Sequence, residues 1–404
     1  MRLSSCLRSR CFHYSLLVVL TLFLATICFR GLLYSPLFSR RLHLMRLSRE
    51  FLQQNLQEGS EALRYFQQLA SVPSTLSPNS SVPCVHRPQG SLQPSRESDP
   101  TPLVITIITT RRRPEYHYLL QVVRGFLDRK SECGPSCSNF QIFICNVDPS
   151  PEDHDEACLL SHVLPTVARY ESEHLDDAPN RFEQEKQDYV FCLARSLEIF
   201  NPEYVLLVED DAVPLKDIFS AFFHLVQVRF PQEPLDGGLY VKFYHPERLQ
   251  GYINPEPMRI LEWIGLGTVA GLVLSWVYMF ISQQQRYSWW MFVAFTIYSM
   301  IVAELAGRHY LLELRRMSPA LYNVVPVTEC CTPAMLFSEA SAKRTLLYLT
   351  ELVCQPGYAK DIALYQELKR RGEWAWALEP NMVKHVGMFS TLRGNFENEE
   401  PLLL

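Results

Sequence analysis

The chain has 404 residues and a formal net charge of −5 at pH 7. This length accommodates one large domain or two smaller ones. The acidic charge balance argues against broad electrostatic binding to nucleic acid. The mean hydropathy of −0.04 excludes a polytopic transporter and indicates that most of the chain is soluble.

The first apolar segment, residues 14–33, follows an arginine-containing tail at residues 1–13. It has roughly the 20 residues that a membrane-spanning helix needs. No Ala-x-Ala cleavage site follows it, and its apolar core is longer than that of a cleaved signal peptide. We therefore expect an uncleaved transmembrane signal anchor at 14–33 behind a cytosolic tail at 1–13. Arginines also follow the segment, so the distribution of positive charge leaves its orientation open.

Two further apolar segments, residues 260–281 and 289–306, are each long enough to span a bilayer. A turn at 282–288 separates them, which predicts a tandem transmembrane hairpin and three transmembrane helices in all. The small residues Gly265, Gly267 and Gly271 should let the two helices of the hairpin approach closely. Such helices do not fit inside a soluble sheet domain, so we interpret the hairpin as an insertion whose two ends are adjacent.

Two features favour an oxidising lumen for the rest of the chain. Asn79 begins an Asn-x-Ser sequon, a candidate glycosylation site. Cys133 and Cys137 bracket a short loop that a disulfide could close. Free buried thiols remain the alternative, because cysteine pairing cannot be determined from one sequence. With a lumenal body, the turn at 282–288 would face the cytosol.

The remaining segments indicate a stem followed by an α/β domain in two parts. Residues 34–102 are predicted to form a lumenal stem helix, at 40–69, and a linker rich in Pro and Ser. Parts 103–259 and 307–404 alternate strands with helices. We expect strands at 103–108, 140–145, 204–208 and 334–337, and helices at 116–127, 180–200, 214–228, 339–352 and 362–370. This alternation predicts a mostly parallel sheet with the functional site at the carboxyl ends of its strands.

An acidic triplet, Glu209, Asp210 and Asp211, directly follows the predicted strand at 204–208. Three adjacent carboxylates repel one another unless a cation gathers them, and hard oxygen ligands suit Mg²⁺ or Mn²⁺. Such an ion could also neutralise a diphosphate leaving group. The alternative is a solvated acidic turn that caps the helix beginning near Pro214. The position of the triplet after a buried strand favours the functional interpretation.

Loops elsewhere supply further candidates. His385 lies two residues before Gly387, and its imidazole could complete a metal shell or bind phosphate, unless it is only a surface histidine. Thr109, Arg111 and Arg112 follow the first predicted strand, where hydroxyl and guanidinium groups could hold a nucleotide. A solvated basic loop is the alternative for these three residues.

The second part of the domain contains the candidate bases. Asp361 begins a predicted helix, where an aspartate either caps the helix or acts as general base for an acceptor hydroxyl. Glu329 is the competing carboxylate. Thr332 follows in the same segment and joins the candidates for cofactor binding.

Together these features resemble a known family. The N-terminal anchor, Val208-Glu-Asp-Asp-Ala212 and the late His-Val-Gly-Met-Phe-Ser segment look like a Golgi glycosyltransferase of the GT-A fold. The triplet is similar to the Asp-x-Asp motif of nucleotide-sugar enzymes, and the histidine segment resembles the class IV branching N-acetylglucosaminyltransferases. The hairpin that splits the domain narrows the resemblance to the post-GPI-attachment N-acetylgalactosaminyltransferases, over essentially the whole chain.

The resemblance implies a GT-A-like nucleotide-sugar-binding fold and the transfer of GalNAc from UDP-GalNAc to the first mannose (β1,4) of the GPI glycan on GPI-anchored proteins. It implies an inverting, metal-assisted displacement with Mn²⁺ as cofactor. It also implies a multi-pass protein of the Golgi membrane with its catalytic domain in the lumen.

The same resemblance suggests roles for individual residues. Asp211 and His385 are the expected metal ligands, with His385 also near the diphosphate, and Glu209 and Asp210 lie near the ribose or the ion. Asp361 matches the base of inverting relatives. The triplet opens with Glu where the motif has Asp, so the role of Glu209 stays open. Two alternatives remain: another lumenal GT-A glycosyltransferase acting on N-glycans or glycolipids, and a non-catalytic membrane scaffold.

Overall fold

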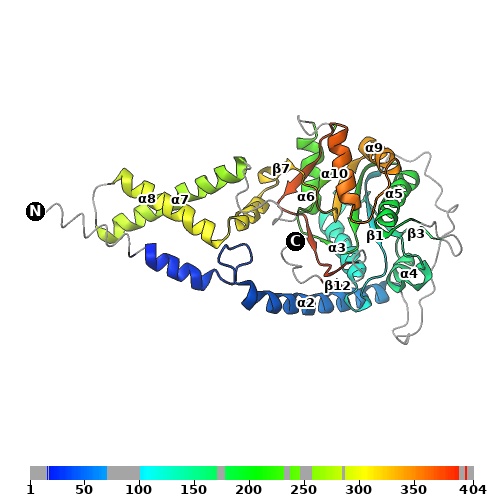
Figure 1. The fold of residues 1–404 in the computed structure, drawn as a ribbon, viewed down its shortest axis with the longest axis horizontal. Coiled ribbons are helices and arrows are strands. Elements are labelled where there is room, and N and C mark those ends of the chain that lie inside the picture. Colours follow the sequence, from blue (N-terminus) through cyan, green and yellow to red (C-terminus); the bar gives the residue numbers. More distant parts are fainter. Residues whose placement is uncertain are drawn as a thin grey trace, which may run out of the picture. The chain divides into compact units, whose positions relative to one another are not determined.

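The computed structural model describes residues 16, 18–70, 101–170, 178–231, 237–245, 257–283, 287–390 and 396–397. These residues form two compact units, whose elements are labelled in Figure 1. The first unit comprises Met1–Ser48 and Gln250–Arg315, and the second comprises Arg49–Leu249 and Arg316–Leu402. The predicted tail at 1–13, the sequon at Asn79 and the centre of the 282–288 turn lie outside the described residues.

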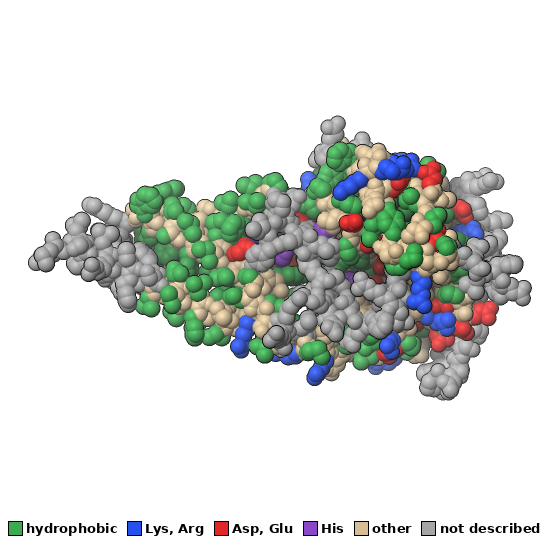
Figure 2. Space-filling view, in the orientation of Figure 1, with side chains coloured by type: hydrophobic (Ala, Val, Ile, Leu, Met, Phe, Trp, Pro, Cys, Tyr) green, Lys and Arg blue, Asp and Glu red, His purple; other side chains and the backbone are tan. Residues whose placement is uncertain are grey.

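The first unit contains two helices that are long and apolar enough to cross a membrane, α7 (Pro257–Ser282) and α8 (Trp289–Ala306). They coincide with the two predicted hairpin helices, and they indicate a membrane protein. Figure 2 shows many hydrophobic side chains on the visible face of this helix pair, interspersed with other residues. Within the predicted anchor, Val18–Cys28 forms a shorter apolar helix. Thr21 of that helix is hydrogen-bonded to Tyr298 of α8 at 2.7 Å.

Small residues set the contact between α7 and α8. A Cβ added at Gly267 would lie 2.3 Å from the Met300 side chain, and one added at Gly271 would lie 2.7 Å from Cα of Thr296. The prediction of close approach is therefore confirmed at these two glycines. It is wrong for Gly265, where an added Cβ would meet nothing within 4 Å.

The second unit is built on an eight-stranded sheet in the order β3-β2-β1-β4-β8-β6-β9-β7. Its strands are β1 (Thr101–Thr109), β2 (Gln141–Asn146), β3 (Thr166–Ala168), β4 (Pro202–Glu209), β6 (Val241–Lys242), β7 (Asn323–Pro326), β8 (Ala334–Ser338) and β9 (Trp376–Glu379). Strands β3, β2, β1 and β4 run parallel, whereas β8 is antiparallel to both β4 and β6. The sheet is therefore mixed rather than mostly parallel. The pairing of β4 with β8 joins the segments before and after the hairpin in one sheet.

Helices cover both faces of this sheet. The principal ones are α3 (Tyr118–Cys133), α4 (Asp155–Ser161), α5 (Arg181–Phe200), α6 (Ile218–His224), α9 (Glu339–Thr350) and α10 (Lys360–Arg370). Short helical turns are η1 (Pro114–Tyr116), η2 (Gly134–Cys137), η3 (Pro151–Asp153), η4 (Leu225–Arg229), η6 (Arg308–Met317) and η7 (Pro319–Leu321). The small strands β5 (Ala212–Pro214) and β10 (Val383–His385) form one pair, and β11 (Phe389–Ser390) and β12 (Phe396–Glu397) form another.

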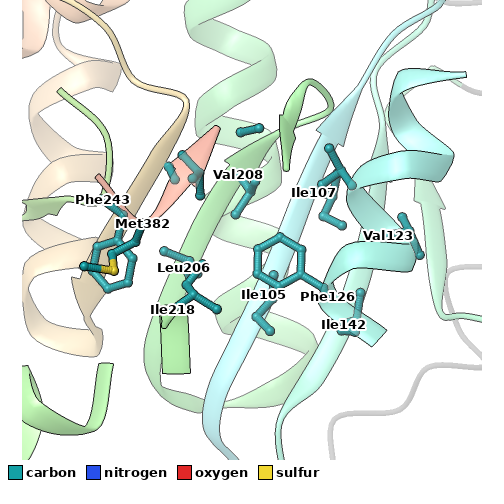
Figure 3. Close-up of a cluster of buried hydrophobic side chains, with 14 of the residues drawn as sticks. Ile105, Ile107, Val123, Phe126, Ile142, Leu206, Val208, Ile218, Phe243 and Met382 are labelled. Atoms are coloured by element: carbon teal, nitrogen blue, oxygen red, sulfur yellow. The ribbon is translucent and has the colours of Figure 1, made fainter. Parts of the chain in front are cut away.

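Alternate residues of the central strands supply the two hydrophobic cores. On β1, Ile105 and Ile107 pack with Phe126 of α3 and Ile218 of α6 (Figure 3). The neighbouring Val104 faces the other core, which contains side chains of α5, α9 and α10. Because both faces are buried, the strand is an almost continuous apolar run, which is why it is easily predicted from the sequence.

The predicted stem helix is observed as α2 (Arg40–Leu69). From Arg49 onward its residues belong to the second unit, and Ala62 and Phe66 enter the main core of the sheet. This part of the predicted stem is thus built into the α/β unit.

Three disulfides lie among the described residues. Cys133–Cys137 closes the short loop as predicted. Cys145–Cys192 links β2 to α5, and Cys330–Cys331 joins two consecutive residues near the end of β4.

Candidate functional site

The acidic triplet lies at the carboxyl end of β4, a central strand of the sheet. Asp210 and Asp211 form the turn into β5, and β5 pairs with β10 so that Ala212 lies opposite His385. This pairing brings Nε2 of His385 to 3.4 Å from Oδ2 of Asp211. Residues from before and after the hairpin therefore form one site.

Three side chains of this site converge as a possible metal centre. Glu209, Asp211 and His385 each offer one ligand atom, and these atoms lie within 4.8 Å of one another. Carboxylate oxygens suit Mn²⁺, and a neutral imidazole nitrogen is a common ligand of divalent metals. Oδ1 of Asp211 and Nδ1 of His385 are buried and make no hydrogen bond to any residue that the structure describes. The donor set therefore fits the divalent ion that the sequence predicts.

Asp210 points away from this group. Its Oδ2 accepts hydrogen bonds from the Thr109 hydroxyl at 2.9 Å and from the Thr110 amide at 3.3 Å. The Thr109 hydroxyl is also hydrogen-bonded to the buried His154, at 2.9 Å from Nε2. Thr109 and Asp210 therefore tie the end of β1 to the end of β4, and the structure keeps them outside the group of possible metal ligands.

Arg112 supplies positive charge to the two buried aspartates. Its Nη2 lies 3.0 Å from Oδ1 of Asp210, and its Nη1 pairs with Oδ2 of Asp211. Burial opposes ionisation of Asp211, but Arg112 and His385 together hold the pKa of Asp211 below its usual value. Burial raises the pKa of Asp210 to about 7, and the charge of Asp211 adds to that shift, although Arg112 opposes it.

Two residues from the segment after the hairpin, Thr332 and Lys360, hold the side chain of Glu209. The Thr332 hydroxyl donates to Oε1 of Glu209 at 3.1 Å, and Lys360 Nζ lies 3.1 Å from the same oxygen. Lys360 is buried and also pairs with Glu185 of α5. Burial opposes the charge on Lys360, but the two glutamates outweigh it and raise its pKa well above the usual value.

Arg111 lies apart from the triplet. Its Nε is 3.1 Å from Oδ2 of Asp148, just after β2, and its Nη1 is 3.5 Å from Asp153. Burial opposes ionisation of Asp148, but hydrogen bonds from the amides of Arg111 and Ser150 hold its pKa below the usual value. The predicted basic loop is therefore divided, with Arg111 on Asp148 and Arg112 on the triplet.

A cavity of about 220 Å³ opens beside the triplet at the carboxyl ends of β1, β2 and β4. Its walls combine apolar side chains with both signs of charge, from the strand ends and from α5. The lining residues are Ile108, Thr110, Arg112, Val147, Pro149, Arg181, Gln184, Glu185, Asp188, Tyr189, Glu209, Asp210 and Lys360. A cavity with such mixed walls, at the strand ends of an α/β sheet, is a usual location for a ligand.

The candidate bases occupy different surroundings. Oδ2 of Asp361 accepts the Cys331 amide at 3.1 Å, and the N-cap position of α10 belongs to Ala359. Asp361 directly follows Lys360, so it lies close to the cluster around Glu209. Glu329, in contrast, is exposed.

With this geometry in place, the chain can be compared with known proteins. Residues 103–384 match the family model described as GPI-N-acetylgalactosamine transferase PGAP4. The match covers well over half of the chain and includes the triplet, both apolar helices and Asp361. The chain belongs to this family. The predicted resemblance is thus confirmed, and the family is one of glycosyltransferases.

Several site residues of this GPI-N-acetylgalactosamine transferase family member escaped the sequence analysis. Glu185 and Lys360, which hold each other beside Glu209, were not among the candidates. Helix α5 was predicted from its apolar spacing alone. Gln184 and Asp188 lie four residues apart on that helix, and both line the cavity. Their spacing puts them on one face of the helix, so this polar pair could have indicated that the face lines a site.

Proposed function

We propose that the protein transfers GalNAc from UDP-GalNAc to the first mannose of the GPI glycan, in β1,4 linkage, on GPI-anchored proteins. Membership of the GPI-N-acetylgalactosamine transferase family supports this acceptor class. The observation that carries the site assignment is the convergence of Glu209, Asp211 and His385 beside a cavity lined by apolar and charged side chains.

In this proposal the unit has a GT-A-like arrangement, with the donor in the cavity at the ends of β1, β2 and β4. The diphosphate would lie near Glu209, Asp211 and His385, and Mn²⁺ held by these residues would neutralise its negative charge. The guanidinium of Arg112, which pairs with Asp211, would add a second positive charge beside the ion. Thr332 and Lys360 orient the Glu209 carboxylate from the other side.

Asp361 is the proposed general base. The Cys331 amide donates to its Oδ2 and fixes the orientation of the carboxylate. The carboxylate takes the proton of the acceptor hydroxyl as the oxygen attacks the anomeric carbon of GalNAc. The bond from that carbon to the UDP oxygen breaks as the new bond forms, so the product has inverted configuration.

The two apolar helices support a reaction at a membrane. We propose a multi-pass Golgi protein with the anchor at 14–33, the hairpin of α7 and α8, and a lumenal catalytic unit that is glycosylated at Asn79. The three disulfides support an oxidising compartment. A GPI-anchored acceptor shares the same membrane, and this confinement raises its effective concentration at the site.

The test uses cells that lack the protein, re-expressing the wild type or one of three variants of matched shape. GalNAc on released GPI glycans is measured by mass spectrometry. We expect the wild type and Glu329→Gln to restore GalNAc, and Asp211→Asn and Asp361→Asn to fail although they reach the Golgi. Failure of the wild type would refute the acceptor assignment. Restoration by Asp211→Asn would instead refute the proposed metal site, and restoration by Asp361→Asn the proposed base.

A further inference from the structure

One face of α2 is buried although the helix was expected to be a stem. Phe51, Asn55, Gly59, Ala62 and Phe66 recur every three or four residues and are all buried. Their neighbours Gln53 and Gln54 are exposed. Four of the five buried residues are apolar or small, as expected of a helix face that packs on a core. Asn55 is the exception, with only 1% of its surface exposed.

Asn55 makes specific hydrogen bonds to two other segments of the second unit. Its Nδ2 donates to the carbonyl oxygen of Val386 at 3.1 Å. The main-chain oxygen of Asn55 accepts a hydrogen bond from Nε2 of Gln121 at 3.2 Å. The same Gln121 nitrogen also donates to the main-chain oxygen of Tyr116 at 2.8 Å. A Cβ at Gly59 would lie 2.1 Å from that Tyr116 oxygen. The helix is therefore held against this surface by a close backbone approach as well as by hydrogen bonds.

The Val386 peptide is the link between α2 and the candidate metal group. Val386 directly follows His385, and its amide donates to the main-chain oxygen of Asp211 at 2.8 Å. Its carbonyl oxygen accepts Asn55 on the other side. Apolar packing reinforces this connection, because Phe51 lies in one buried cluster with Val386 and Met388.

We propose that Asn55 is a positioning residue that fixes the His385 segment against Asp211, which makes α2 part of the catalytic unit. The inference rests on the proposed function, since it assumes that His385 and Asp211 hold the divalent ion. A buried carbonyl that loses its donor moves to find another partner or remains unpaired. Movement of the Val386 peptide shifts His385, and residues that orient metal ligands typically contribute a factor of about 10–100 to metal affinity.

The test compares full-length wild type with Asn55→Leu, whose side chain has the same number and branching of heavy atoms but cannot donate a hydrogen bond. Asn55→Ser, whose side chain is too short to reach Val386, is the second variant, and Gln53→Glu on the exposed face of the same helix is the control. Binding of Mn²⁺ alone is measured from the electron paramagnetic resonance signal of the free ion. Thermal unfolding without metal reports on folding.

We expect Asn55→Leu and Asn55→Ser to unfold cooperatively, with at least about tenfold weaker Mn²⁺ binding. The Michaelis constant for the donor at saturating Mn²⁺ should stay close to that of the wild type. Unchanged Mn²⁺ binding in a folded variant would overturn the inference, as would the failure of both variants to fold, because Asn55 would then act in folding alone. If the wild type itself binds no Mn²⁺, the proposed metal site falls together with the inference. Failure of the inference alone leaves wild-type binding intact.

Discussion

Gly387 lies directly against the carboxylate of Asp211, because a Cβ at position 387 would fall 2.0 Å from Oδ2 of Asp211. The two residues come from opposite sides of the hairpin in the sequence. The pairing of β10 with β5 brings them together and sets the separation between Asp211 and His385. The geometry of the site therefore depends on a position that has no side chain.

Gly387→Ala is predicted to disrupt the site without removing any proposed ligand. The added methyl group would force Asp211 away from Arg112 and His385, and Asp211 has only 1% of its surface exposed and little room to move. We expect transfer of GalNAc to a GPI acceptor to fall by about 100-fold or more, since misplacement by about 1 Å can have such an effect.

The control for this change is Gly265→Ala, where an added Cβ meets nothing within 4 Å. Transfer by Gly265→Ala should equal that of the wild type. Wild-type transfer by Gly387→Ala, measured with the same purified acceptor, would show that Asp211 does not need its observed position.

Lys360→Met is predicted to destabilise the fold. Lys360 lies between Glu185 and Glu209, so its loss leaves two largely buried carboxylates facing each other. Breaking a buried ion pair from one side costs about 3–5 kcal/mol, and we expect the lower end because the two glutamates retain some exposure. Chemical unfolding of the purified protein measures this loss.

Two further variants make the Lys360 result specific. Adding Glu185→Gln to Lys360→Met removes one of the two negative charges that repel each other, and it should recover part of the lost stability. Lys343→Met removes an exposed lysine from an i,i+4 pair with Glu339 and should change stability by less than about 0.5 kcal/mol. Equal stability of Lys360→Met and wild type would show that Lys360 does not hold the two glutamates.

The long central strands could be predicted because both faces of the sheet are buried. The segment predicted at 204–208 is observed as β4, Pro202–Glu209, and its apolar run stands out from the sequence around it. Strands such as β6, Val241–Lys242, have only two residues and show no periodicity. The half of the sheet beyond β4, where antiparallel and parallel pairs mix, contains such short strands, so its topology could not be derived from the sequence.

The residues of the candidate site could be predicted from their types, but the directions in which their side chains point could not. The triplet and His385 were recognised, and Glu209, Asp211 and His385 do converge. The sequence could not indicate that Asp210 turns toward Thr109, because a turn sends adjacent side chains in different directions. Nor could it reveal Lys360, whose role depends on α5 and β4 meeting α10 across a long separation in the sequence.

The last prediction concerns pH and the buried Lys242 of β6. Its Nζ donates to the carbonyl oxygens of Thr328 and Cys330, at 3.0 and 2.7 Å, and so holds the loop that precedes Thr332. Burial lowers the pKa of Lys242 to about 8 from a usual value of 10.5, although Asp361 opposes the shift. Below pH 8 the lysine is protonated in both the folded and the unfolded protein, so the free-energy cost of burying it does not change with pH. Between pH 8 and 10.5 the unfolded chain binds more protons than the folded protein, so this residue's contribution to stability becomes more favourable as pH rises.

Lys242→Met removes this titration and leaves the other groups in place. The free energy of unfolding of wild type minus that of Lys242→Met should therefore be flat from pH 6 to 7.5. It should then rise between pH 8 and 10, by up to roughly 3 kcal/mol. Denaturant unfolding of the two proteins in the same detergent at each pH measures the difference. Parallel stability curves up to pH 10 would contradict the lowered pKa, and a difference that fell with pH would mean that folding raises the affinity of Lys242 for its proton.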